Sequence, residues 1–195
     1  DDIKEIEEYG KELPLMREVD VSYYLRQEGR TLILGPYEKD CVPWAVDGVP
    51  PHFGQELLPP DLDRLQDIFE GAIHRVPVLG TAGVKTIVNG PITYTPDGGP
   101  LVGPAAGIDN YFMCTAFSFG IVQGGGAGKF TAQWIVEGEP EIDLWDTDPR
   151  RFGPYATQQY ALEKITEFYG MEYAIAYPGE ERETGRRAKT SPIYD

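Results

Sequence analysis

Residues 110–138 hold the glycine spacing best suited to binding chemistry. Gly120, Gly124 and Gly128 recur every four positions, directly after a short apolar run at residues 111–115. This run has the length and composition of a buried parallel strand, and the glycines leave one side of the following helix almost bare. A strand that leads straight into a helix directs unpaired N–H groups and the positive end of the helix dipole beyond the sheet. We therefore predict that the helix start binds an anionic group.

Two known glycine-rich motifs do not match this stretch. A P-loop needs a glycine five residues before the Gly-Lys pair and a Ser or Thr after it, where this chain has Gln123 and Phe130. Gly124, Gly126 and Lys129 do not complete the dinucleotide-binding pattern G-x-G-x-x-G. Close packing of a small-faced helix explains the glycines as well as ligand binding does, so the spacing leaves both alternatives open.

Histidine and cysteine, which most often carry metal or nucleophilic chemistry, are sparse. His52 and His74 have no Cys, Asp or Glu around them at metal-ligand spacing, so we expect no metal site. No Ser-His-Asp pattern is apparent, so the sequence does not indicate catalysis of that type. Cys41 and Cys114 lie far apart among apolar neighbours, which predicts buried thiols in a reducing compartment. We expect the cytoplasm, or the mitochondrial matrix if the chain is eukaryotic.

The composition excludes several classes of partner. The chain has 195 residues, of which 41% are hydrophobic, enough for a globular core. Its formal net charge of -15 argues against binding to nucleic acid or to an anionic membrane surface, because both need clustered Lys and Arg. No apolar run reaches the roughly 18 residues that a membrane-spanning helix requires.

The expected elements combine an antiparallel sheet, a helix that covers it, and a closing strand and helix. Residues 17–35 are typical of two strands around a turn at residues 28–30, and residues 61–73 have the near-3.6 period of an amphipathic helix. The pattern predicts an α+β fold. Two further strands are expected at residues 84–88 and 91–95. The glycine-rich helix is expected to end at Glu137, before Gly138, and a last helix is expected at residues 156–169.

The two ends of the chain have a different character from the middle. Residues 1–12 are charged and weakly helical, and residues 177–195 are typical of an extended linker. The chain begins at Asp1 rather than at a methionine, so we expect a piece of a longer protein.

Short sequence blocks in a fixed order give a more specific indication than any single motif. They are LP at 13–14, SYYLRQE at 22–28, GPYE at 35–38, GVPP at 48–51, DLDR at 61–64, VNGPITYTPD at 88–97, PLVGP at 100–104, FSFGI at 117–121 and YPGEER at 177–182. Together they resemble the dimethylglycine and sarcosine dehydrogenase family of flavin enzymes, which has a fold like that of D-amino-acid oxidase. The resemblance extends over nearly the whole chain.

The resemblance implies that the chain covers the middle of such an enzyme. It lacks the N-terminal turn that binds the ADP part of FAD, the upstream segment in which many relatives link FAD covalently to a histidine, and the C-terminal tetrahydrofolate-binding region. The implied domains are part of the substrate-binding sheet with its cover helix (1–95), part of the FAD domain (96–138), and a helix and linker toward the folate region (139–195). The implied partners are an amine substrate and the remainder of the parent chain or a partner subunit.

The resemblance also implies which residues contact the flavin. Backbone amides at the start of the glycine-rich helix would face the pyrimidine edge of the ring, and the connection at residues 97–103 would pass beside it. The implied cofactor-binding residues are Pro100, Gly103, Ala116, Phe117, Ser118, Phe119, Gly120 and Ile121. One of these positions and one nearby position depart from the family pattern, because relatives commonly have glycine at Ala116 and the mammalian-type sequences have histidine at Gln123.

Tyr24 is the implied catalytic residue. Tyr23 and Tyr24 are neighbours on a predicted strand, so at most one of them can face the flavin, and the family match favours Tyr24. The resemblance implies oxidative demethylation of dimethylglycine or sarcosine, with the methylene group released as formaldehyde or passed to tetrahydrofolate. An alternative is a non-catalytic module of the same fold that acts in binding or subunit assembly.

Overall fold

The computed structural model describes residues 12–180, so the predicted N-terminal helix and most of the predicted linker lie outside the described residues. The described chain is α+β, as predicted, with helices and two small antiparallel sheets. It divides into two compact units, each described below by itself. The first comprises residues 12–91 and 169–180, and the second comprises residues 92–168.

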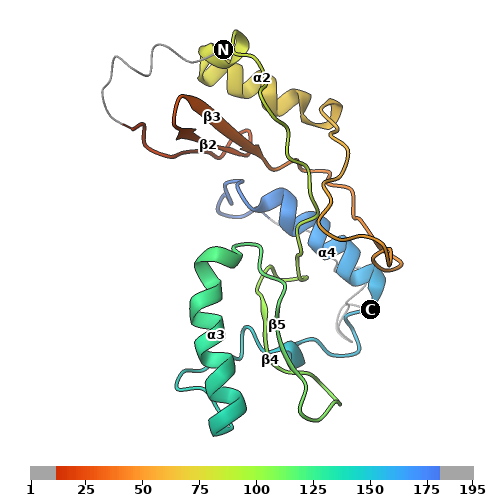
Figure 1. Ribbon diagram of the computed structural model, residues 1–195. Helices are drawn as coiled ribbons and strands as arrows, with labels where there is room; N and C mark the ends of the chain where they lie inside the picture. The colour runs from red at the N-terminus through yellow and green to blue at the C-terminus, as the bar shows by residue number, and fades with distance from the viewer. Residues whose placement is uncertain (1–11, 181–195) are drawn as a thin grey trace. The chain divides into compact units, whose positions relative to one another are not determined.

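The first unit is built on an antiparallel sheet with the strand order β1-β2-β3. Figure 1 labels β2 and β3 of this sheet. Strands β2 (Tyr23–Glu28) and β3 (Thr31–Pro36) form the predicted hairpin, with Gly29 at φ 57° in its turn. The stretch before β2 forms the separate short strand β1 (Met16–Glu18), because turns follow it and Ser22 has a φ of 71°. One predicted strand is therefore two.

Helix α2 (Gln66–Arg75) covers one face of this sheet, as the amphipathic pattern predicts. It follows a 3₁₀ turn, η1 (Asp63–Leu65), so the helix begins later than expected. Its buried residues Ile68 and Ala72 form a core with Tyr23 and Leu25 of β2. A second 3₁₀ turn, η2 (Pro77–Gly80), begins at the proline that ends the helical pattern.

The strands predicted at residues 84–88 and 91–95 are absent from the structure, and these predictions are wrong. The segment is extended, but its apolar residues Val84 and Val88 are about three-quarters exposed, at 75% and 74%. A strand needs a neighbour for its backbone hydrogen bonds. Instead of a ladder, the Leu58 amide donates to the Asn89 carbonyl at 2.8 Å, and the Asn89 side chain donates to the Pro59 carbonyl at 2.6 Å.

The second unit contains the hairpin of β4 (Leu101–Pro104) and β5 (Phe112–Thr115). The prediction of a buried parallel strand at residues 111–115 is wrong, because β5 pairs antiparallel with β4 and is only half-buried or exposed. The connection between the strands, residues 105–111, is shorter than the dozen or more residues that a parallel crossover needs.

Helix α3 (Gly120–Glu137) follows β5 and ends at Gly138, which has a φ of 90°, as predicted (Figure 1). A 3₁₀ turn, η3 (Pro149–Arg151), leads toward the last helix, α4 (Gln158–Met171). Helix α4 lies two residues further along the chain than the sequence pattern indicated, and the boundary between the two units falls within it.

The cysteines differ from expectation in their burial. Cys41 is half-buried and Cys114 is exposed, so the prediction of buried thiols is wrong, although neither forms a disulfide within the described residues. The exposed position of Cys114 follows from the pairing of β5 in a two-stranded hairpin. None of the helices between residues 12 and 180 is both long and apolar enough to cross a membrane.

Candidate functional site

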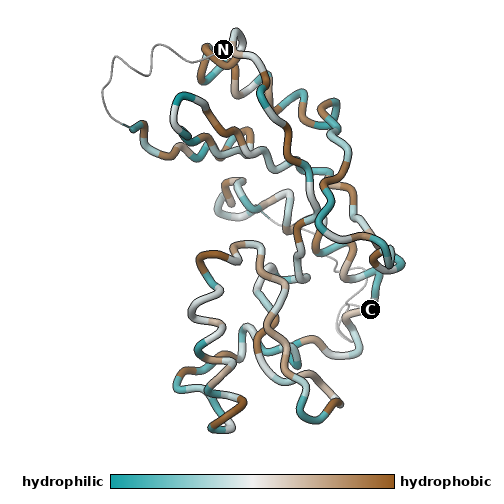
Figure 2. The backbone as a smooth tube through the Cα atoms, in the orientation of Figure 1, coloured by the Kyte–Doolittle hydropathy of each residue, from teal (hydrophilic) through white to brown (hydrophobic). Residues whose placement is uncertain are grey.

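The start of α3 leaves its backbone donors without a side-chain cap. Phe119 is the N-cap residue and accepts no capping hydrogen bond, and no acidic residue lies in the first turn. The first N–H groups of a helix have no partner inside the helix, and they concentrate its positive dipole end. Ile121 and Val122 beside them are 102% and 85% exposed, and Figure 2 shows apolar residues at this end of α3. This end of the helix therefore offers exposed amide donors in apolar surroundings.

Ala116 turns the chain from β5 toward α3. It is buried at 7% exposure and has a φ of 62°, in the left-handed region that favours glycine. A non-glycine residue in this conformation costs roughly 1–2 kcal/mol. A glycine at this position would adopt the same angle without that cost.

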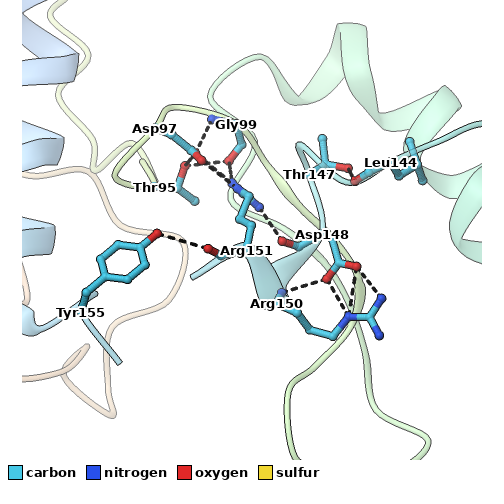
Figure 3. Close-up of polar contacts among 9 residues, drawn as sticks. All are labelled: Thr95, Asp97, Gly99, Leu144, Thr147, Asp148, Arg150, Arg151 and Tyr155. Carbon is cyan, nitrogen blue, oxygen red and sulfur yellow. Dashed lines mark hydrogen bonds and ion pairs between the residues drawn. The ribbon is translucent and has the colours of Figure 1, made fainter. Parts of the chain in front are cut away.

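The loop that precedes β4 is held by a polar cluster of Thr95, Asp97, Gly99 and Arg151 (Figure 3). Arg151 donates from Nε to Asp97 Oδ2 at 2.7 Å and from Nη2 to Asp97 Oδ1 at 2.8 Å. The same Nη2 lies 2.9 Å from the Gly99 carbonyl, and the Gly99 amide donates to Asp97 Oδ1 at 3.1 Å. The Thr95 hydroxyl is 2.6 Å from the Gly99 carbonyl. Hydrogen bonds among residues 95–99, together with those from Arg151 of η3, therefore hold the loop in place.

The electrostatics of this cluster favour an ionised Asp97. Burial by itself would raise the pKa of Asp97, but the hydrogen bonds from Arg151 and Thr95 outweigh it and hold the pKa below its ordinary value. The Arg151 side chain is only 9% exposed, whereas that of Asp97 is 45% exposed. Sequence analysis missed Arg151. Its only signal was the Pro149-Arg-Arg stretch, in which nothing indicated the partner Asp97.

Pro100 immediately precedes β4 and is buried, and Gly103 lies within β4. Leu101 pairs with Thr115, so Pro100 and Ala116 lie at the same end of the hairpin. Gly103 has a φ of 136°, and a Cβ built on it would lie 2.8 Å from the ring of Trp134. Packing of α3 on β4 therefore explains this glycine, and its contact with a flavin stays a prediction.

The glycine face of α3 is open in the described chain. A Cβ built on Gly124, Gly125, Gly126 or Gly128 would meet no atom within 4 Å. Close packing against a neighbour, one of the alternatives left open by the spacing, therefore does not explain these glycines within residues 12–180, and contact with a ligand stays a prediction.

Tyr24 belongs to the first unit and lies on the face of the sheet opposite α2. Tyr23 is fully buried in the core, whereas Tyr24 is half-buried and has its ring centroid 6.0 Å from that of Tyr173. Tyr173 stacks on Tyr37 at 4.5 Å, and the Arg17 guanidinium lies 4.1 Å from the centre of its ring. The two tyrosines face opposite sides of the sheet, as the alternation of a strand requires, and the role of Tyr24 at the substrate stays a prediction.

Tyr169 extends this aromatic cluster of Tyr24, Tyr37, Tyr169 and Tyr173. Its ring lies 5.1 Å from that of Tyr37, and its hydroxyl donates to Glu38 Oε2 at 2.9 Å. Burial, with the negative charge of Glu38, raises the pKa of Tyr169 far above its ordinary value, so this phenol stays neutral. The cluster therefore places aromatic rings with hydroxyl groups on the face of the sheet opposite α2.

Comparison with known proteins identifies the family. The profile of the FAD dependent oxidoreductase family matches residues 3–134, and that of the FAD dependent oxidoreductase central domain matches residues 137–191. The chain belongs to the FAD dependent oxidoreductase family. Members related to it include dehydrogenases of methylated amino acids, as the resemblance implies.

Curated relatives cover nearly the whole chain. Mouse mitochondrial dimethylglycine dehydrogenase is 47% identical over 98% of the chain, and mouse mitochondrial sarcosine dehydrogenase is 37% identical over 94%. The mitochondrial pyruvate dehydrogenase phosphatase regulatory subunit of mouse is 31% identical over 93%. The chain spans only 23%, 20% and 21% of the length of these three relatives.

The start of α3 fits the flavin that the family implies. The pyrimidine edge of an isoalloxazine carries carbonyl acceptors and gathers negative charge on reduction. Exposed, uncapped amides at Gly120 and Ile121, with no carboxylate in the first turn, match such an edge in charge and in hydrogen-bonding type. The same amides would repel a cationic group.

Proposed function

We propose that this chain is the substrate-side and flavin-edge part of an FAD-dependent enzyme that oxidatively demethylates an N-methylglycine-type amine, dimethylglycine or sarcosine. The observation that carries the proposal is the 47% identity to dimethylglycine dehydrogenase over 98% of the chain. The uncapped start of α3 supports it, because those amides suit the electron-rich edge of a flavin.

Bound FAD would supply the hydride acceptor for the methyl carbon next to the substrate nitrogen. The chain's own residues supply binding and charge stabilisation. The amides of Gly120 and Ile121, with the α3 dipole behind them, would hold the flavin edge and stabilise negative charge that develops on it. The Asp97–Arg151 pair holds the loop that leads into the segment from Pro100 to Gly103. Tyr24 orients the amine from the sheet of the substrate-binding part.

The oxidised substrate then reacts outside the flavin. Loss of hydride leaves an iminium ion, and addition of water releases formaldehyde and the amine with one methyl group fewer. Transfer of the methylene group to tetrahydrofolate is the other route, and it would use the region of the parent protein beyond this chain. Cytoplasm or mitochondrial matrix is the expected compartment, in line with the mitochondrial relatives.

The test uses the intact flavoprotein that contains this chain, mixed without oxygen with dimethylglycine, sarcosine or glycine. We expect the two methylated amines to bleach the visible flavin absorbance, and formaldehyde to appear in amounts equal to the flavin reduced. Glycine has no methyl group and serves as the matched control. A flavin that none of the methylated amines reduces would contradict the proposal. Acid precipitation of the same sample reports whether the flavin is covalently held.

A second candidate is a non-catalytic module of the same fold that binds a partner subunit. The regulatory subunit among the relatives supports it. The same spectra separate the two candidates, because a module of this kind would remain colourless, or would hold a flavin that no amine reduces.

A further inference from the structure

Tyr24, Arg17 and Gly35 form one row across the three strands of the first unit. The register pairs Arg17 with Tyr24 and Tyr24 with Gly35. Because Tyr23 and Leu25 are buried against α2, the row lies on the opposite face of the sheet, where Tyr24 is half-buried. The neighbours of the Tyr24 ring on this face therefore decide where its hydroxyl lies.

The Tyr24 ring lies directly over Gly35. A Cβ built on Gly35 would be 2.0 Å from Tyr24 Cε1, 2.1 Å from Cζ and 2.5 Å from the hydroxyl oxygen. These distances are far below any real carbon contact, and the atoms concerned are the hydroxyl end of the ring. Even the smallest side chain at position 35 is therefore incompatible with this ring position.

The backbone at Gly35 does not itself call for glycine. Unlike Gly29 in the hairpin turn, whose φ is 57°, Gly35 lies outside the left-handed region and inside a regular strand. Glycine inside a strand usually weakens it, or marks a close approach of another group. Here the close approach is by the Tyr24 ring.

Tyr173 limits the ring from another side. Its centroid lies 6.0 Å from that of Tyr24, and it is held by stacking on Tyr37 and by the Arg17 guanidinium. Arg17 also donates from Nη2 to the Glu172 carbonyl at 2.5 Å, next to Tyr173 in sequence. The Tyr24 ring therefore has a packed aromatic neighbour in addition to Gly35.

We propose that Gly35 is a positioning residue that sets the location of the Tyr24 hydroxyl for the substrate amine. This inference rests on the proposed function, in which Tyr24 orients the amine. A displacement of about 1 Å in a positioning group can lower a rate by about a hundredfold, so the absence of one methyl group at position 35 has catalytic consequences.

The experiment is a double-mutant cycle in the intact flavoprotein, using Gly35→Ala and Tyr24→Phe. The measured quantity is the rate constant of flavin reduction at saturating amine, together with the visible flavin spectrum and the thermal midpoint. We expect each single substitution to slow reduction by about ten- to a hundredfold. In the Tyr24→Phe background, Gly35→Ala should change the rate less than twofold, because the hydroxyl that it displaces is already gone.

Two matched controls separate positioning from a general loss of structure. Gly54→Ala adds a methyl group into open space in the same unit, and should leave the rate and the thermal midpoint unchanged. Gly71→Ala creates a clash with Val21 of 2.7 Å, away from Tyr24, and should lower the thermal midpoint without slowing flavin reduction.

Each outcome has a distinct meaning. Equal slowing by Gly35→Ala in the native and the Tyr24→Phe backgrounds, or no slowing in either, would overturn the inference while the proposed function stands. An unchanged rate in Tyr24→Phe would remove Tyr24 from the mechanism and the inference with it. A flavin that no methylated amine reduces would refute the proposed function itself.

A crystal structure of the Gly35→Ala protein gives a readout that does not depend on turnover. We expect the Tyr24 ring to move off β3. A ring that stays in place, with the new methyl group accommodated by a shift of the strand, would overturn the inference whatever the kinetics show.

Discussion

Tyr23 and Ile121 are both large apolar residues at the beginning of an element, yet Tyr23 is 0% exposed and Ile121 is 102% exposed. In the first unit, β2 and α2 bury their apolar faces against each other. In the second unit, α3 has no buried residue along its whole length, although its ends are apolar (Figure 2). The sheet buries its apolar face within the described chain. Helix α3 instead leaves the apolar residues at its ends exposed to solvent, and its first amides have no side-chain cap. This difference supports the proposal that the start of α3 binds the flavin edge.

The largest expected effect concerns the buried core that β2 and α2 form in the first unit. Tyr23→Ala should lower the free energy of unfolding by about 3–5 kcal/mol, because it removes a fully buried aromatic side chain from the core. Urea unfolding of the intact protein measures it. Tyr23→Phe is the matched control, since the Tyr23 hydroxyl has no hydrogen-bond partner among the described residues. Its removal should cost less than about 1 kcal/mol or should stabilise. A large loss in Tyr23→Phe would show that the hydroxyl has a partner.

The polar cluster at the loop before β4 should show an intermediate effect. Asp97→Asn keeps the shape but removes the charge that Arg151 pairs with, and should cost about 1 kcal/mol at neutral pH after allowance for the exposure of Asp97. Glu28→Gln is the control, because the Arg26–Glu28 pair is exposed on both sides and should contribute almost nothing. A cost for Glu28→Gln as large as that for Asp97→Asn would contradict the distinction.

The same cluster predicts a pH dependence. The pKa of Asp97 is lowered in the folded protein, so its stabilising contribution is complete above the unfolded value of about 3.9 and is lost as the pH falls through the lower folded value. The stability difference between the native protein and Asp97→Asn should be constant from neutral pH down to about 5 and should shrink at more acidic pH. Urea unfolding at a series of pH values checks it, and a difference that grows on acidification would contradict it.

The smallest expected effects concern the open glycine face of α3. Gly124→Ala should stabilise the helix by about 0.5–1 kcal/mol if the face stays open in the intact protein, because the added methyl group meets no atom in the described chain. Gly138→Ala should instead destabilise by about 1 kcal/mol, because position 138 has a φ of 90°. Loss of flavin or of stability in Gly124→Ala would show that another part of the parent protein covers this face.

Local patterns predicted the elements whose contacts lie close in sequence. The hairpin of β2 and β3, the cover helix α2 and the end of α3 at Gly138 each follow from alternation, a 3.6 period or a left-handed cap. The strand predictions at residues 84–88 and 91–95 were wrong because alternation indicates propensity, whereas a strand also needs a hydrogen-bonded neighbour. The direction of β5 depended on a short connection that periodicity does not detect.

The sequence predicted only those features of the candidate site that depend on neighbouring residues within one element. The alternation of β2 separates Tyr23 from Tyr24, and the glycine run locates the α3 start. Arg151 could not be paired with Asp97 from sequence, because the two residues are 54 positions apart. Nor could Gly35 be connected with Tyr24, since that contact depends on the register of β2 and β3.

Amide hydrogen exchange in the intact protein, compared between its flavin-loaded and flavin-free forms, tests the central claim most directly. We predict slower exchange at residues 117–123 in the loaded form, because the flavin edge would occupy the uncapped amides at the start of α3. Exchange in β2 and β3 should be the same in both forms. Equal exchange at residues 117–123 with and without flavin would contradict the assignment of this helix start to the cofactor.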